Sequence, residues 1–416
     1  MTPNYFQPQR RKWLMQAASL AAMFSLAAPA SALAAQKAKH VRLASAWQLG
    51  NSYHVGVLSR RAAGLVVTAA VEVPTRAHGV WVEASGSLLA VARRPGDWLL
   101  RWQPDDSSHG GKAVAWGWIE PDRAFNGHVI ASADGRLLYS TETHLETGAG
   151  LIGVRDAATL EKIGEWSTGG SDPHELLLDE DGFLLVANGG ISALPETGRI
   201  KLHPDRMDAS LVRLDARSGE LLGQWRVADK RLSLRHIAWG PRLADSARGS
   251  RVLGIAMQAE HDDAADKAAA PVLAIFDGKT LKVQSGGIGQ ELRGYGGDIA
   301  FAAGRFSVSC PRAHGVAHWR ADGSWAGFTP LKEACALASL PAECHASSAD
   351  SVLWAAGNPT ALAFDKFGDV LPQSLKAVRL DNHWSVLGQP LPESANRRAP
   401  TCAQPSNNNQ LLACGG

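Results

Sequence analysis

The sequence is short of cysteine, of excess charge and of apolar segments long enough to cross a membrane. Five cysteines in 416 residues are too few for disulfides to replace a hydrophobic core. The formal net charge is only +2 and there is no basic run, so nucleic acid is not expected as a partner. The Ala/Leu-rich stretch near the N-terminus is interrupted by Ser25 and Pro29 and is too short for a comfortable membrane span.

Common catalytic signatures are also missing from the sequence. There is no serine nucleophile elbow with an ordered Ser-His-Asp set, no glycine-rich phosphate loop and no Cys-pair metal motif. These absences argue against the common hydrolases and nucleotide enzymes, and they leave other activities open.

The sequence does contain a repeated strand pattern. Within residues 125–190, a histidine twice opens an alternating apolar run, an Asp-Gly turn follows, and a second apolar run ends in a polar residue. Asp-Gly between such runs predicts a β-hairpin, because glycine accepts the positive φ of a tight turn. The turns lie at 133–136 and 179–182. Further hairpins are expected at 151–166, 211–225, 273–285 and 316–328.

Two hairpins per repeat give four strands in roughly 40 to 60 residues, which is typical of a propeller blade. We therefore predict an all-β fold: a single seven-bladed β-propeller of four-stranded antiparallel blades spanning residues 35–388. The repeats are placed near 41–75, 77–119, 127–167, 173–227, 235–285, 297–329 and 335–387. The first and last are the least regular, as expected if strands from both chain ends close the ring.

Residues 1–34 predict an export signal. The basic residues 10–12 (RRK) precede an apolar stretch, and residues 32–34 (ALA) offer small side chains for cleavage near Ala34. The arginine pair favours twin-arginine export, with ordinary secretion as the alternative. We expect a periplasmic protein that is a monomer and has no membrane span once the signal is removed.

The five cysteines leave at least one unpaired. An oxidising compartment permits disulfides, but the sequence does not determine their connectivity. Cys310 ends an apolar run and is interpreted as a small buried hydrophobe. The other four are Cys335 and Cys344 in the last repeat, and Cys402 and Cys414 in the C-terminal tail.

Polar residues recur at two places in the repeats. In a propeller, the start of each innermost strand shares a face with the end of the second strand, because adjacent strands are antiparallel. The first position carries His78, His128, His174, His236 and Asp298. The second carries Arg93, Arg94, Glu142, His144, Asn188, Gln258 and Arg312. The fold is therefore expected to gather these residues at one mouth of the channel.

Four imidazoles from successive blades predict a metal site, since neutral imidazole binds zinc, copper, iron and nickel. Two alternatives stay open: a polar mouth for an organic or anionic ligand, and histidines that only hydrogen-bond neighbouring blades. Arginines at a mouth favour a carboxylate or phosphate, although Arg94 has a solvated rim charge as its alternative. Glu142 and Asn188 are candidate ligands, partners that orient imidazoles, or turn residues.

Residues 191–210 form a long insertion between strands two and three of the fourth repeat. A loop of this length in a compact repeat is more often functional than not. We predict a lid or a partner-docking surface on the same face as the mouth.

Several long stretches resemble the DUF1513 family of exported bacterial proteins. They are GHVIASADGRLLYSTETHLETGAGLIGVRDA (127–157), DPHELLLDEDGFLLVANGG (172–190), GRIKLHPDRMDASLVRLDARSGELL (198–222) and LRGYGGDIAF (292–301). The resemblance covers residues 41–329. It implies a propeller with twin-arginine export, often encoded beside imelysin-like iron-regulated proteins and dihaem oxidoreductases, and hence periplasmic iron-uptake proteins as partners. The Cys-containing tail at 389–416 is not a feature of that family.

Hypotheses from different functional classes follow. The favoured one is a periplasmic binding protein that holds a transition metal (iron, copper or zinc), or a small anion or metal complex, at a histidine-lined channel mouth. The second is a metal-dependent hydrolytic or redox enzyme that uses the same histidines. The third is an interaction scaffold, because the fold alone does not choose among functions.

Overall fold

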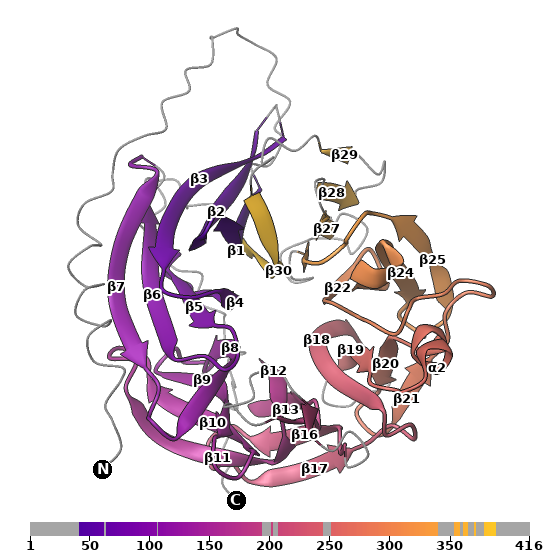
Figure 1. Ribbon diagram of the computed structural model, residues 1–416. Coiled ribbons are helices and arrows are strands. Elements are labelled where there is room, and N and C mark those ends of the chain that lie inside the picture. Colours follow the sequence, from indigo (N-terminus) through magenta and orange to yellow (C-terminus); the bar gives the residue numbers. More distant parts are fainter. Residues whose placement is uncertain are drawn as a thin grey trace, which may run out of the picture.

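The computed structural model describes residues 41–61, 64–105, 107–193, 201–202, 207–243, 251–339, 353–357, 361–364, 370–371 and 378–387. Apart from helix α2 (Ala264–Ala269) and one 3-10 turn (Pro311–Ala313), their regular elements are strands, which radiate around a central axis (Figure 1). Within these ranges no helix is long and apolar enough to span a membrane. The expected signal, the C-terminal tail and Cys344, Cys402 and Cys414 lie outside the described residues.

Five sheets are blades whose four antiparallel strands run outward from the axis in chain order. The first two are β4 (Ala77–Val82), β5 (Leu88–Ala92), β6 (Trp98–Asp105) and β7 (Gly110–Trp118), then β8 (Arg123–Ala131), β9 (Leu137–His144), β10 (Ala149–Asp156) and β11 (Lys162–Ser171). The third is β12 (Pro173–Leu178), β13 (Phe183–Asn188), β16 (Ser210–Asp215) and β17 (Leu221–Trp225). The last two are β18 (Leu232–Arg242), β19 (Arg251–Ala259), β20 (Leu273–Phe276) and β21 (Leu281–Gln284), then β22 (Ile299–Ala302), β23 (Arg305–Cys310), β24 (Gly315–Arg320) and β25 (Trp325–Pro330).

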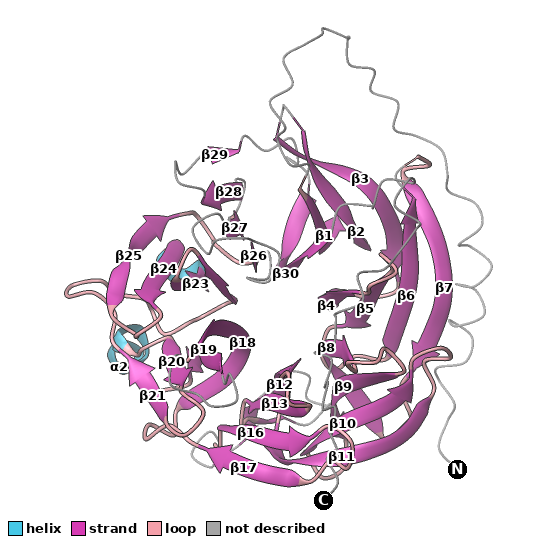
Figure 2. Ribbon diagram, turned by 180° about the vertical axis from the view of Figure 1, so that it is seen from behind, coloured by secondary structure: helices cyan, strands magenta, loops and turns pink. Residues whose placement is uncertain are grey.

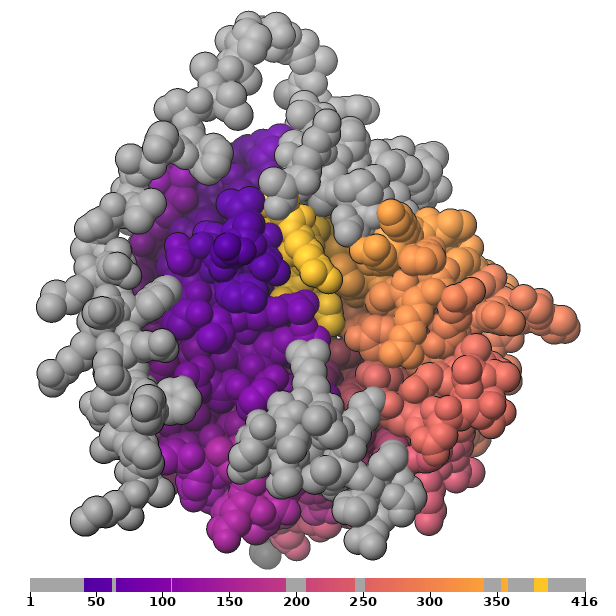
Figure 3. Space-filling model, viewed as in Figure 1, coloured from indigo at the N-terminus to yellow at the C-terminus, as the bar shows by residue number. Residues whose placement is uncertain are grey.

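A sixth blade is built from both ends of the described chain. Strand β30 (Val378–Leu387) is innermost, and β1 (Arg42–Leu49), β2 (Ser52–Arg61) and β3 (Gly64–Val73) follow outward. In the space-filling view β30, in yellow, lies between the indigo and orange blades (Figure 3). Mixing of the two chain ends is thus observed as expected.

The expected seven-bladed propeller is wrong, because the described residues form six complete blades. Beside the six complete blades, the remaining four-stranded sheet consists of β26 (Leu337–Ser339), β27 (Leu353–Ala356), β28 (Ala361–Phe364) and β29 (Val370–Leu371). Its strands have only three, four, four and two residues. Moreover, 335–387 is not one repeat, because its last strand pairs with β1. Periodicity in the sequence cannot show this, since the partner of β30 lies at the other end of the chain.

The predicted hairpin turns form as expected. Gly135 and Gly182 have φ of +69° and +86°, and the strands on either side of each turn pair antiparallel (Figure 2). Apolar side chains of neighbouring blades share buried clusters; Trp98 and Trp102 of β6 are fully buried in the same cluster as Val57 of β2. Removal of such surfaces from water is the main source of stability in this arrangement.

Two further expectations concern single segments. Cys310 is fully buried and unpaired, which confirms its interpretation as a core residue, and burial raises the pKa of its thiol to about 12. In the insertion, β14 (Ser192–Ala193) and β15 (Lys201–Leu202) form a two-stranded sheet. Residues 194–200 and 203–206 lie outside the described part, so the lid remains a prediction.

Ring closure can be tested at Trp384 of β30. Its indole is 5% exposed, packs with Leu43 and Trp47, and donates a hydrogen bond to Ser45 Oγ at 3.0 Å. We expect Trp384→Ala to lower the free energy of unfolding by about 3 to 5 kcal/mol in denaturant titrations. The half-exposed Trp118 is the control, and its alanine variant is expected to cost about 1 kcal/mol or less. Equal losses in the two variants would contradict this account of closure.

Candidate functional site: an axial histidine cluster

The innermost strands place five histidines on the channel axis. They are His78 of β4, His128 of β8, His174 of β12, His236 of β18 and His383 of β30. All five are buried, and the ring centroids of their contacting pairs are 4.3 to 5.9 Å apart. The structure therefore brings together the four histidines predicted from the sequence and adds a fifth from the closing strand.

Each of these histidines lies in a β-bulge. The pairing register of each of these five strands shifts at the histidine, for example between Ala77 and Val80 on β4 and between Leu234 and Ile237 on β18. The same holds for β8, β12 and β30. An extra residue in one strand turns a side chain out of the normal alternation. The bulges therefore direct five imidazoles toward the axis.

The cluster also requires a glycine at one point of close approach. Gly127, directly before His128, has φ of +105°, a conformation that side chains rarely adopt. A Cβ at this position would lie only 2.9 Å from the Cβ of His78. Gly127 thus lets adjacent blades bring His78 and His128 together.

The Nε2 atoms of the cluster face one another. His174 Nε2 and His236 Nε2 are 3.1 Å apart, and His383 Nε2 and His78 Nε2 are 3.3 Å apart. Potential ligand atoms lie within 4.8 Å of one another in three overlapping sets. The sets are His78, His174 and His236; His78, His128 and His383; and His236, Asp298 and His383.

Two carboxylates contact the opposite side of the imidazole rings. Glu175 is 3.7 Å from His128 Nδ1 and 3.4 Å from His236 Nδ1. Asp298 is 3.4 Å from His383 Nδ1. Backbone N–H groups fix both acids: Ile237 donates to Glu175 and Leu337 donates to Asp298, each at 2.8 Å. Metal-binding histidines commonly present Nε2 to the ion and Nδ1 to such a carboxylate.

Burial sets the protonation of the cluster. Desolvation, with smaller contributions from neighbouring imidazoles and arginines, holds the pKa of four of the five well below the usual value. These are His78, His128, His174 and His236. For His383, burial acts in the same direction, but the charge and hydrogen bond of Asp298 outweigh it and raise the pKa. Four imidazoles are therefore neutral at pH 7, the form that binds metals.

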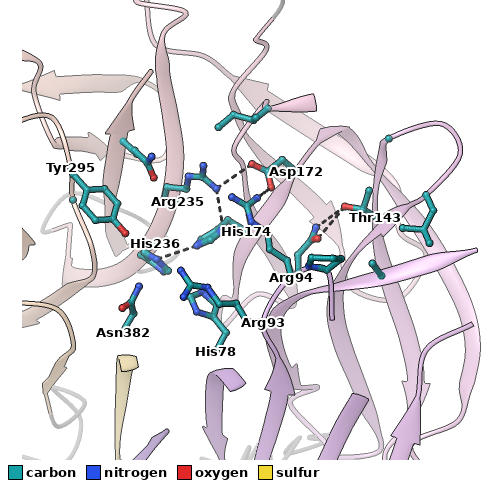
Figure 4. A pocket seen from close by; sticks show the side chains of 18 of the residues that line it. His78, Arg93, Arg94, Thr143, Asp172, His174, Arg235, His236, Tyr295 and Asn382 are labelled. Atoms are coloured by element: carbon teal, nitrogen blue, oxygen red, sulfur yellow. Dashed lines mark hydrogen bonds and ion pairs between the residues drawn. The ribbon is translucent and has the colours of Figure 1, made fainter. Parts of the chain in front are cut away.

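The histidines separate two cavities along the channel. One, of about 380 Å³, opens at the predicted mouth, and we call it the arginine mouth. Its lining includes Arg93, Arg94 and Arg235, which Figure 4 labels, and also Arg312. The other, of about 600 Å³, is bounded by all seven innermost strands and includes Glu175 and Asp298; we call it the carboxylate side. The two sides of the cluster thus differ in charge.

Most residues predicted at the mouth lie near the cluster. Arg93, Arg94, Gln258 and Arg312 line the arginine mouth together with His78, His174 and His236. Asp298 and His128 instead line the carboxylate side. The starts of innermost strands and the ends of second strands therefore meet at the mouth for the first seven of these residues, whereas Asp298 and His128 were predicted there but lie on the carboxylate side.

Glu142 does not line either cavity and is corrected to a buried ion-pair residue. It is fully buried, 2.8 Å from Arg155 and 2.9 Å from Lys162. Asn188 is also corrected: its Nδ2 donates to Thr168 O at 3.0 Å, fully buried between strands. Side-chain direction decides both cases, because alternate residues of a strand face opposite sides of the blade.

Sequence reasoning missed several residues of the site. Glu175 and Arg235 each neighbour a predicted histidine, so adjacency was an available signal. His383 was not predicted because its strand was assigned to the last repeat as the fourth strand. A fourth strand would lie at the outer edge of the blade, away from the channel. The arginine mouth is also lined by residues that the sequence analysis missed: Asn126, Asp172, Tyr295 and Asn382.

The fold and the site together define a β-propeller with a histidine cluster across its channel. The chain belongs to the DUF1513 family, proteins of unknown function, whose model matches residues 71–387. A comparison with the curated proteins finds no match.

A comparison with solved structures finds similar chains. Hydrazine synthase of Kuenenia stuttgartiensis is 15% identical, with a TM-score of 0.54 over 77% of this chain and 94% of that one. Streptogramin B lyase is 10% identical, with a TM-score of 0.47 over 71% and 81%. Saccharomyces cerevisiae Sqt1 is 11% identical, with a TM-score of 0.46 over 80% of each chain. Of these three, only hydrazine synthase has a TM-score above 0.5, and at 15% identity it shows a shared fold and nothing about function.

The corrected role of Glu142 can be tested by Glu142→Gln. The substitution leaves Arg155, which is 1% exposed, without its closest anion, and we expect the free energy of unfolding to fall by about 3 to 5 kcal/mol. Glu146→Gln, at an exposed position of the adjoining turn, is the control and is expected to change it by about 0.5 kcal/mol at most. A stable Glu142→Gln protein with altered ligand binding would contradict the structural role.

Proposed function

We propose that this protein is a binding protein that holds one transition-metal ion among the axial histidines. The observation that carries the proposal is that buried histidines from five different strands form three overlapping sets of three residues, one of them with Asp298, and that the ligand atoms within each set lie within 4.8 Å of one another. Neutral imidazole together with carboxylate, with no thiolate in these sets, suits zinc, copper or iron rather than calcium or magnesium.

The spacing of the nitrogen atoms supports a single ion. Metal–nitrogen bonds of about 2.0 to 2.1 Å place neighbouring ligand atoms of one ion about 2.9 to 3.4 Å apart. The two Nε2 pairs, at 3.1 and 3.3 Å, have this separation. A metal ion bound by the two Nε2 atoms of a pair would take the place of the hydrogen bond that joins them in the absence of metal.

Unsatisfied buried atoms also support the proposal. His128 Nε2 and His78 Nδ1 are buried and have no hydrogen-bond partner among the described residues. Each such atom costs about 1 to 3 kcal/mol when it stays unpaired. A cluster that served only to hydrogen-bond adjacent blades would have no reason to keep these atoms unpaired.

A metal-dependent enzyme is the second candidate, favoured by the cavity that reaches His78, His174 and His236 from the arginine mouth. In an enzyme, the ion would keep an open coordination position there for water or substrate, whereas a closed ligand set indicates binding or structure. Coordination number, measured by X-ray absorption on the loaded protein, separates the two.

Metal content tests the binding proposal. We expect about one zinc, copper or iron ion per chain in protein purified from its native compartment, measured by elemental mass spectrometry. The double variant His128→Ala, His174→Ala is expected to lose most of it, because it removes ligands from two of the three sets. His318→Gln removes another buried histidine, outside the cluster and bound to Ser307 and Thr329, and is expected to retain the metal. Native protein without stoichiometric metal would reject the proposal.

We further propose that the protein works in the periplasm, where iron-uptake proteins are its expected partners, and that residues 1–34 direct it there after folding. Export of a folded chain would allow the metal to be bound beforehand. Replacing the pair at 10–11 by Lys-Lys is expected to retain the protein in the cytoplasm, as measured by cell fractionation. Unchanged export of this variant would favour ordinary secretion instead.

A further inference from the structure

We infer that the arginine mouth binds a small oxyanion carrying two or more negative charges, a phosphate or a polycarboxylate, directly over the axial histidines. The site for the anion stands on the residues of the mouth alone.

The charge of the mouth is the first argument. Four arginines and one carboxylate, Asp172, line it, and these five side chains together carry three net positive charges. Glu260, buried near Arg235, offsets at most one of them. Positive charge concentrated in a cleft between low-dielectric walls attracts anions and raises their local concentration. Guanidinium groups form bidentate hydrogen bonds with carboxylate and phosphate.

Three of the four arginines are held in place before any ligand arrives. Asp172 pairs with Arg94, and its Oδ2 is 3.1 Å from Arg235 Nη1 (Figure 4). The guanidinium carbon of Arg312 lies 4.8 Å from the centre of the Tyr295 ring. Fixing these side chains in advance reduces the entropy that binding would otherwise cost.

Arg235 also carries an unsatisfied buried donor. Its side chain is only 4% exposed, and its Nε has no hydrogen-bond partner among the residues described. Nη1 of the same group contacts His174 Nδ1 at 3.4 Å, so the guanidinium lies between the mouth and the cluster. A buried donor of this kind is satisfied by an acceptor oxygen entering from the mouth.

The shape of the cavity limits the ligand. A volume of about 380 Å³ is near the lower end of small-molecule pockets and excludes a folded partner. Asn126, Tyr295 and Asn382 add neutral polar groups to the lining. Beyond the histidines, Glu175 and Asp298 repel anions and attract cations. The channel is thus built to receive an anion from one side and a metal ion from the other.

Calorimetric titration of metal-free protein with inorganic phosphate, and separately with citrate, tests the site. We expect millimolar or tighter binding that weakens as salt is added, because the attraction is electrostatic. Arg93→Gln and Arg312→Gln are each expected to weaken it by about tenfold or more. Arg136→Gln removes the same charge from a turn where the side chain is 83% exposed, and is expected to leave binding unchanged.

Binding of phosphate alone assigns a phosphoryl ligand, and binding of citrate alone assigns a polycarboxylate; either outcome supports the site. No heat with either anion up to about 10 mM, or equal weakening by Arg136→Gln, overturns it. Repeating the titration with metal-loaded protein separates the two proposals. If the protein binds the anion but takes up no metal, only the metal proposal is rejected. If it takes up metal but does not bind the anion, only the oxyanion proposal is rejected.

Discussion

The pairing of β30 with β1 is the constraint on which the rest of the structure depends. A radial arrangement of sheets has an axis only if its ends are joined, and here the last described strand takes the innermost place in the blade that contains the first three. This pairing buries Trp384 and also carries His383 into the channel. Closure of the fold and completion of the histidine cluster are therefore the same structural event.

The cluster is formed by local irregularity within a regular scaffold. Regular strands would alternate side chains between the two faces of each blade, and the bulges break that alternation at each axial histidine. Because five blades do this at the same height, the imidazoles meet. Such a gathering desolvates every ring, which keeps four of them neutral and suited to bind an ion.

Charge is divided along the axis. Arginines surround one side of the cluster, while Glu175 and Asp298 contact it from the other. The acids contact Nδ1 atoms and are themselves fixed by backbone N–H groups. The two ends of the channel therefore present opposite charge to the same histidine cluster.

The sequence by itself determined the strand content, the Asp-Gly turns and the four repeated histidines, because hairpin signals and alternation are local properties of the chain. It did not determine the short sheet β26–β29, the assignment of β30 to the first blade, or the place of His383. Nor could it separate Arg93, which faces the mouth, from Glu142, which pairs with Arg155 inside a blade. Only the tertiary structure decided these, because strand partners and bulges depend on contacts between residues far apart in the chain.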